Sequence, residues 1–208
     1  MKFYKYPRTP HLPWSPGTTN DDKTLKNTDH FIGKRVVASI KMDGEATTMY
    51  PNHIHARSID SKDHESRHYV KGLHGSIKHM IPGGWRICGE NLYAKHSIHY
   101  TKLKAYFMVY SVWDDHNNAL SWDKTKQFCA KLGLTTVPVF YEGSWSHDDI
   151  QHTYSAILYE EEGYVVRCEK SFSFEDFDIN VAKYVRKGHV QTDEHWMNQK
   201  VIPNLLKG

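Results

Sequence analysis

The chain has 208 residues, of which 39% are hydrophobic and 25% charged, with a net charge of +3 at neutral pH. These values are ordinary for a globular protein and exclude a strongly basic tail of the kind that binds nucleic acid nonspecifically. Three cysteines without a CxxC pair argue against a disulfide framework or a thiolate zinc site, and favour a reducing, cytoplasmic location. No secretory signal and no membrane-spanning run of ~18 apolar residues is present, so we expect no membrane contact.

Residues 1–27 are rich in Pro, Gly, Thr and Asp and are expected to form a loop. Leu12 and Trp14 are large apolar residues, so this loop should pack onto the body of the protein. Residues 35–40 form a β-branched run, KMDGE follows as a turn, and two further strands, TTMYP and HIHARSI, are expected after it. Apolar spacing predicts a helix over 66–80.

The second half continues with alternating strands and helices. Helices are expected over 120–132, closed by Gly133, and after Ser146 as N-cap. A last helix is expected over 193–206, within a helical tail 191–208. Strands are expected at 85–93, 104–114, 135–143, 161–169 and 180–187. The pattern predicts one α+β domain spanning residues 1–208, with mainly antiparallel sheets flanked by helices.

Charged residues recur in or beside these apolar strands. Burying them is costly unless they share a polar cavity. Cations suit phosphates and carboxylates suit Mg²⁺, so the set predicts a single anionic ligand together with a metal. The residues are Lys41 in KMDGE, Arg57, Glu90 in CGENLY, Glu162 in EEGYVVR, and Lys183, Arg186 and Lys187 in KYVRK.

In this order the motifs resemble those of the covalent nucleotidyltransferases, which are ATP-dependent RNA and DNA ligases and mRNA-capping guanylyltransferases. The stretches HLPWSPG, GENLYAKHSI and YFMVYSVWD are most similar to the ATP-dependent RNA ligases. The resemblance runs from His11 to Val190. DNA ligases and capping enzymes usually carry an OB domain after the last motif, but too few residues follow it here, so we expect no OB domain and an RNA ligase or a minimal ligase.

The resemblance implies a lysine–AMP intermediate made from ATP with Mg²⁺ or Mn²⁺, followed by joining of 5′-phosphate and 3′-hydroxyl RNA ends. Lys41 would be the nucleophile, and Lys183 with Arg186 or Lys187 would hold the α-phosphate. A nearby cation of the KYVRK strand and a metal are expected to lower the pKa of the Lys41 amine. An end-healing kinase or phosphatase is a candidate partner.

The remaining roles implied by the resemblance concern the nucleoside and the metal. Glu90 would accept a hydrogen bond from the ribose, Arg57 would contact the ribose or the new phosphate end, and Tyr110 would stack on adenine. Glu162 would bind the metal. Asp43 would shape the turn and reach the phosphate-binding network.

Two departures leave alternatives open. RNA ligases commonly read KxDGxN, but Ala46 stands where the Asn is expected. In the last motif two residues separate Lys183 from Arg186 instead of one. A nucleotide-binding module with impaired catalysis, or a minimal DNA ligase, are therefore the alternative interpretations. His53 and His55 are interpreted as surface histidines rather than metal ligands, because no further ligand is evident.

Overall fold

Strand β1 (Arg35–Ile40) lies inside a four-stranded antiparallel sheet of the computed structural model, which describes residues 2–157, 161–188 and 200–208. The strand order is β11-β9-β1-β8, and the other members are β8 (Val139–Ser144), β9 (Gly163–Cys168) and β11 (Val181–Val185). All but the first residue of β1 are buried, because its two faces contribute to different cores. The apolar run therefore reflects a strand covered on both sides.

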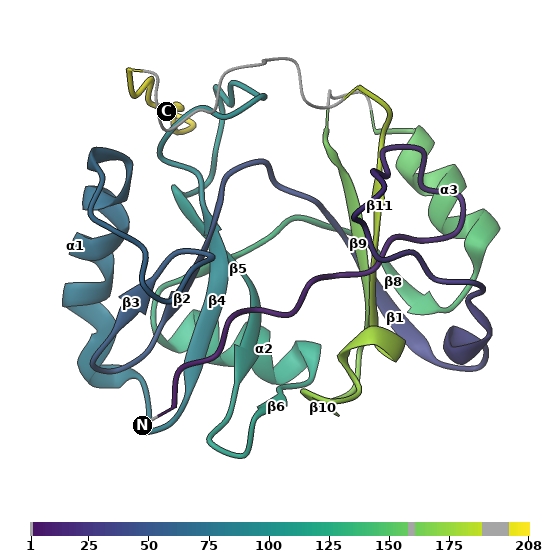
Figure 1. Ribbon diagram of the computed structural model, residues 1–208, viewed down its shortest axis with the longest axis horizontal. Coiled ribbons are helices and arrows are strands. Elements are labelled where there is room, and N and C mark those ends of the chain that lie inside the picture. Colours follow the sequence, from purple (N-terminus) through teal and green to yellow (C-terminus); the bar gives the residue numbers. More distant parts are fainter. Residues whose placement is uncertain (1, 158–160, 189–199) are drawn as a thin grey trace.

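A second, seven-stranded sheet stands opposite the first (Figure 1). Its strands run in the order β10-β6-β5-β4-β2-β3, and β7 pairs parallel with β5. The strands are β2 (Glu45–Met49), β3 (Ile54–His55), β4 (Arg86–Asn91), β5 (Phe107–Trp113), β6 (Asn118–Ala119), β7 (Thr135–Thr136) and β10 (Phe172–Ser173).

Helices cover the outer faces of both sheets (Figure 1). Helix α1 (His68–Ile77) and α2 (Trp122–Lys131) pack on the seven-stranded sheet, and α3 (His147–Ser155) packs on the four-stranded sheet. Short 3₁₀ turns are η1 (Asp29–Phe31), η2 (Glu65–Arg67), η3 (Lys78–Met80) and η4 (Phe177–Ile179). The predicted helix ends are confirmed: Ser146 accepts a hydrogen bond from the Asp149 amide at 3.2 Å, and Gly133 has φ 68° after α2.

The N-terminal segment crosses from one sheet to the other (Figure 1). At one end the Tyr4 amide donates to the Tyr50 hydroxyl beyond β2, at 2.8 Å. At the other, Leu12 is fully buried in the core of the four-stranded sheet, and Trp14 packs against that core. The prediction of a packed N-terminal loop is confirmed.

The C-terminal prediction was wrong where it can be compared. Residues 193–199 of the predicted helix lie outside the described residues. Residues 200–208 are extended and not helical, with bridges from Pro203 to Ala94 and from Leu206 to Leu103. The tail docks onto the loop between β4 and β5 through backbone hydrogen bonds and the buried side chain of Asn204, whose amide donates to the Leu92 carbonyl at 2.8 Å. Its apolar residues Ile202, Leu205 and Leu206 are exposed, so the apolar spacing does not mark a helix face here. None of the helices in the described residues is long and apolar enough to cross a bilayer.

Candidate active site

Lys41 stands at the end of β1, where the chain leaves the four-stranded sheet. Its amide donates to the Gly163 carbonyl at 2.9 Å, which ties it to the start of β9. Its amine donates to Glu162 Oε2 at 2.5 Å, and the two side chains are 25% and 10% exposed. Two residues 121 apart in sequence thus form a half-buried ion pair because β1 and β9 are neighbouring antiparallel strands.

The KMDGE turn is held by the loop that follows β4. Asp43 Oδ2 accepts from the Ile98 amide at 2.8 Å, and the Asp43 amide donates to the Tyr100 hydroxyl at 3.0 Å. A Cβ on Gly44 would meet the Asn91 carbonyl oxygen at 2.5 Å, so only glycine allows this close approach. Asp43 therefore shapes the turn, whereas its contact with phosphate stays a prediction. Tyr100 was not predicted, because a tyrosine in a loop has no distinguishing sequence signal.

Glu90 lies on β4 directly opposite Ala46 of β2. Burial, and then the nearby negative charges of Glu162 and Asp43, raise the pKa of Glu90 to about 8, although the Lys41 charge opposes this shift. Three carboxylates thus surround one lysine. At neutral pH Glu90 is largely protonated when no ligand is bound.

The two lysines of the site have pKa values that shift in opposite directions. Burial lowers the pKa of Lys41, but the charges of Glu162, Glu90 and Asp43 outweigh it and raise the pKa overall. The prediction that a cation and a metal together lower the pKa of Lys41 concerns the metal-bound site and stays a prediction. Burial, and then the charge of Lys41, lower the pKa of Lys183.

Tyr110 reaches the space between the sheets through an irregularity of strand pairing. Cys88 of β4 pairs with Ser111 of β5, and Gly89 pairs with Val109, so Tyr110 is the extra residue of a bulge. Its ring meets the edge of Tyr6 with centroids 4.9 Å apart. Burial raises the pKa of Tyr110 well above its usual value. Tyr6 was not predicted, because it lies in a loop far from every motif.

The remaining cations occupy different positions around this centre. Arg186 follows β11, and its Nε donates to the Glu161 carbonyl at 2.7 Å, while its amide donates to the Glu162 carbonyl at 3.1 Å. Lys187 is exposed in the turn beyond it, so the contacts favour Arg186 as the partner of Lys183. Arg57 is exposed after β3, and its charge helps to lower the pKa of Lys183. Most of the predicted charges thus lie at strand ends, and only Glu90 and Lys183 are within strands.

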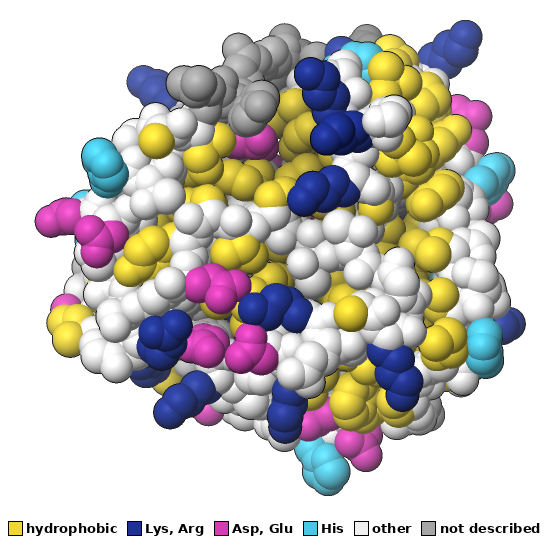
Figure 2. All heavy atoms as spheres, turned by 180° about the vertical axis from the view of Figure 1, so that it is seen from behind, with side chains coloured by type: hydrophobic (Ala, Val, Ile, Leu, Met, Phe, Trp, Pro, Cys, Tyr) yellow, Lys and Arg dark blue, Asp and Glu magenta, His cyan; other side chains and the backbone are white. Residues whose placement is uncertain are grey.

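The donor set fits a divalent cation. Carboxylate oxygens are the ligands that Mg²⁺ and Mn²⁺ prefer. Burial is the main cause of the raised pKa of Glu90, and the charges of Glu162 and Asp43 add to it. Glu162 therefore stays the residue predicted to hold the metal. Within the described part of the chain, the one group of three possible metal ligands close to one another is Asp114, Asp115 and His116, in the turn between β5 and β6. On the face opposite that of Figure 1, a hollow with a hydrophobic floor contains acidic atoms and has Lys and Arg side chains along its rim (Figure 2).

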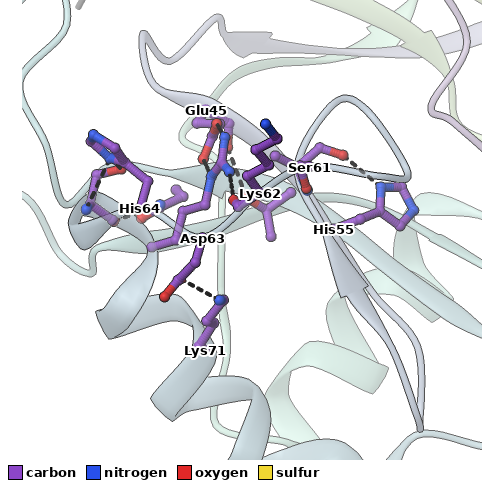
Figure 3. Close-up of polar contacts among 12 residues, drawn as sticks. Glu45, His55, Ser61, Lys62, Asp63, His64 and Lys71 are labelled. Carbon is purple, nitrogen blue, oxygen red and sulfur yellow. Dashed lines mark hydrogen bonds and ion pairs between the residues drawn. The ribbon is translucent and has the colours of Figure 1, made fainter. Parts of the chain in front are cut away.

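Glu45, the last residue of KMDGE, belongs to a separate cluster beside α1 (Figure 3). Its Oε2 accepts from Arg67 Nε at 2.7 Å, and the pair is buried. A pocket of about 280 Å³ nearby is lined by Lys62, Lys71 and several histidines, including His53, His55 and His74. It contains none of the predicted site residues. His55 is only 2% exposed, so its interpretation as a surface residue was wrong.

Comparisons with known proteins identify the family of the chain and its fold. A family model described as RNA ligase matches residues 34–185. No curated protein sequence matches the chain. Among solved structures, Naegleria gruberi RNA ligase with PPi has a TM-score of 0.57 and 16% identity over 78% of this chain and 52% of its own. A mutant of that ligase with ATP and Mn has a TM-score of 0.56 and 15% identity over the same shares.

Form 2 of an archaeal ATP-dependent RNA ligase has a TM-score of 0.61 and 14% identity, over 88% of this chain and 48% of that one. At such identities the likeness concerns the fold, and it confirms the predicted α+β nucleotidyltransferase class. This chain spans about half the length of these ligases.

Proposed function

The chain belongs to the RNA ligase family, and from this premise we propose that it is an ATP-dependent RNA ligase that activates itself as a Lys41–AMP adduct. It would then join RNA 5′-phosphate and 3′-hydroxyl ends, using Mg²⁺ or Mn²⁺. Fold relatives have been solved with ATP and Mn and with PPi, which are the substrate, metal and product that this reaction requires.

The observation that carries the proposal is the position of Lys41. Its amine lies against Glu162 at 2.5 Å, and Lys183 and Glu90 both affect the electrostatics of the same centre. A buried lysine amine beside another cationic side chain is an arrangement that activates lysine nucleophiles, and Lys183 supplies that cation here. Lys41 and Lys183 belong to the four-stranded sheet or its strand end, whereas Glu90 belongs to the seven-stranded sheet, so a ligand at this centre would contact both.

The chemistry begins from a resting, protonated Lys41 paired with Glu162. Attack on the α-phosphorus requires the neutral amine, so the ion pair must open and the proton must leave. The Nζ–P bond then forms as the bond to pyrophosphate breaks, while Lys183 and Arg186 bind the α-phosphate. A divalent cation at Glu162 would reduce the charge that keeps Lys41 protonated and would neutralise the phosphates.

Nucleotide binding without turnover is the second candidate, and Ala46 favours it. Position 46 faces Glu90 across the β2–β4 pair, so an amide expected there in the family would lie beside the site. The absence of this amide would slow the chemical step and leave ATP recognition intact.

One assay separates the two candidates. The protein is incubated with α-³²P-ATP and Mg²⁺ or Mn²⁺, and then run on a denaturing gel. An RNA ligase retains label on the protein, Lys41→Ala removes it, and Lys124→Ala, an exposed lysine on α2, leaves it unchanged. A labelled Lys41→Ala protein would exclude Lys41 as the nucleophile, and an unlabelled wild-type protein that binds ATP would support the second candidate.

The natural substrate is tested with pre-adenylated strands. Sealing of 5′-adenylated RNA to a 3′-hydroxyl end bypasses the first step, so it shows whether the later steps are intact. Equal sealing of DNA and RNA nicks would favour a minimal DNA ligase over an RNA ligase.

A further inference from the structure

Residues 10–17, which include HLPWSPG, run beside β11 and form an isolated parallel bridge between His11 and Lys183. The Lys183 amide donates to the Pro10 carbonyl at 2.9 Å, and the Leu12 amide donates to the Lys183 carbonyl at 2.8 Å. The Gly17 amide donates to the Val185 carbonyl at 2.9 Å. Both backbone groups of Lys183 are therefore bonded to residues more than 150 positions away, and the loop determines where this strand lies.

The same loop brings a carboxylate to the Lys183 side chain. Asp22 Oδ2 accepts from the amide and hydroxyl of Thr19, at 3.0 Å and 2.9 Å, which closes the turn. Asp22 Oδ1 is directed to the other side, 3.8 Å from Lys183 Nζ. The two side chains are 19% and 18% exposed. One oxygen thus holds the loop while the other faces the lysine.

A buried histidine supports Asp22 from behind. His11 is 1% exposed, and its Nε2 lies 3.5 Å from Asp22 Oδ1. Its Nδ1 is 2.8 Å from Ser15 Oγ, which accepts from the Val185 amide at 2.9 Å. Burial, and then the charge of Lys183, lower the pKa of His11 to about 4. His11 therefore stays neutral at physiological pH and adds no positive charge that would compete for Asp22.

Four charged groups act on Lys183. Lys41 and Arg57 repel it, whereas Asp22 and Glu162 attract it. Asp22 is the larger of the two attractions, and the repulsion by Lys41 exceeds the attraction by Glu162. A lysine side chain is flexible, so without Asp22 no stronger charge would hold it beside the site. Glu162 is already paired with Lys41, and a second cation there would compete for the carboxylate.

We propose that Asp22 is a positioning residue of the adenylylation site: its carboxylate holds the Lys183 ammonium group beside the N-terminal loop, in place for the α-phosphate. The inference rests on the proposed function, because Lys183 matters only if it meets the α-phosphate. Through Asp22 and Lys183, the N-terminal loop that includes HLPWSPG would affect catalysis without contacting the substrate.

The test compares four variants in single-turnover adenylylation at saturating ATP. Asp22→Asn keeps an oxygen for Thr19 but loses the charge, and it should slow adenylylation ~10-fold while changing the ATP dissociation constant less than ~3-fold. Asp22→Glu keeps the charge and should recover most of the rate. Thr19→Val loosens the turn without touching the charge, so it should lower the melting temperature and leave the rate unchanged. Asp21→Asn, at the exposed neighbour, should resemble the wild type.

The outcomes separate this inference from the proposed function. Equal rates for Asp22→Asn and the wild type would overturn the inference alone. So would a loss in Asp22→Glu as large as that in Asp22→Asn, or a matching loss in Thr19→Val, because each would mean that the shape of the loop matters and the charge does not. If the wild-type protein does not label itself, the proposed function fails, and the inference fails with it.

Discussion

Glu90 shows how one side chain makes stability depend on pH. Its pKa of about 8 in the folded protein exceeds the ordinary value of 4.5. Between these values the folded state binds more protons than the unfolded chain, so the free energy of unfolding falls as pH rises from ~4.5 to ~8 and then levels off. The change is at most on the order of 5 kcal/mol.

Glu90→Gln should remove this dependence. We expect the wild type to lose more stability than the variant between about pH 5 and about pH 9, measured by urea denaturation at each pH. All other titrating groups are common to both proteins, so the difference isolates Glu90. Parallel curves would mean that Glu90 is ionised in the folded protein throughout this range.

A substitution at Ala46 tests the first chemical step, the formation of the lysine–AMP adduct. An amide at position 46, opposite Glu90, would supply the polar partner that KxDGxN enzymes have. An imperfectly paired polar group in a closed site costs ~1–3 kcal/mol, or roughly 5- to 150-fold in rate. Ala46→Asn should therefore raise the single-turnover adenylylation rate by ~10-fold or more, with a smaller change in ATP affinity. Ala46→Ser, which adds a shorter polar group, is the control. Equal rates for wild type and Ala46→Asn would show that this site needs no amide there.

At the scale of elements, the start of β9 must approach β11 very closely. A Cβ on Gly163 would overlap the carbonyl oxygen of Tyr184, and the Gly163 carbonyl accepts from the Lys41 amide. Gly163→Ala should therefore push β9 away, cost ~1–3 kcal/mol or more, and reduce Lys41 labelling because Glu162 moves with the strand.

Gly72 provides the matched comparison for this substitution. It lies within α1, and a Cβ there meets no atom within 4 Å. Gly72→Ala should stabilise the protein by ~0.5–1 kcal/mol and leave labelling unchanged. Thermal melts and labelling of both variants decide the matter: a Gly163→Ala protein with wild-type melting temperature and labelling would contradict the role of this contact.

The elements also show what sequence patterns can and cannot predict. Long periodic segments such as β1, β5 and α2 were predicted, because burial of one or two faces leaves a periodic apolar pattern. The two-residue strands β6 and β10 were missed, since two residues have no periodicity. The candidate nucleophile Lys41 and the carboxylates near it follow from local motifs. Their ion pairs, the bulge at Tyr110 and the approach of Asp22 to Lys183 depend on long-range pairing, which has no local signal.

For the whole molecule, the two sheets divide the predicted nucleotide contacts between them. Lys41, Glu162 and Lys183 belong to the four-stranded sheet or its strand ends, whereas Glu90 and Tyr110 belong to the seven-stranded sheet. A bound nucleotide would therefore join the sheets through its base and its phosphates. When the base and the phosphates belong to one molecule, binding of one part raises the effective concentration of the other part at its own contacts. Separate adenosine and phosphate molecules lack this advantage.

The last prediction follows from this division. An ATP analogue with a methylene between the α- and β-phosphates binds without reacting, and at ~100 times its dissociation constant it should stabilise the fold by ~2.7 kcal/mol. For a chain of this size that raises the melting temperature by ~5–10 °C. Adenosine and tripolyphosphate added together, unlinked and at the same concentrations, should give a much smaller rise, because each contacts one sheet. Tyr110→Ala should reduce the rise by weakening the adenosine side, and Lys183→Ala should do so by weakening the phosphate side. A full rise with the unlinked fragments would mean that the nucleotide is held by one sheet alone.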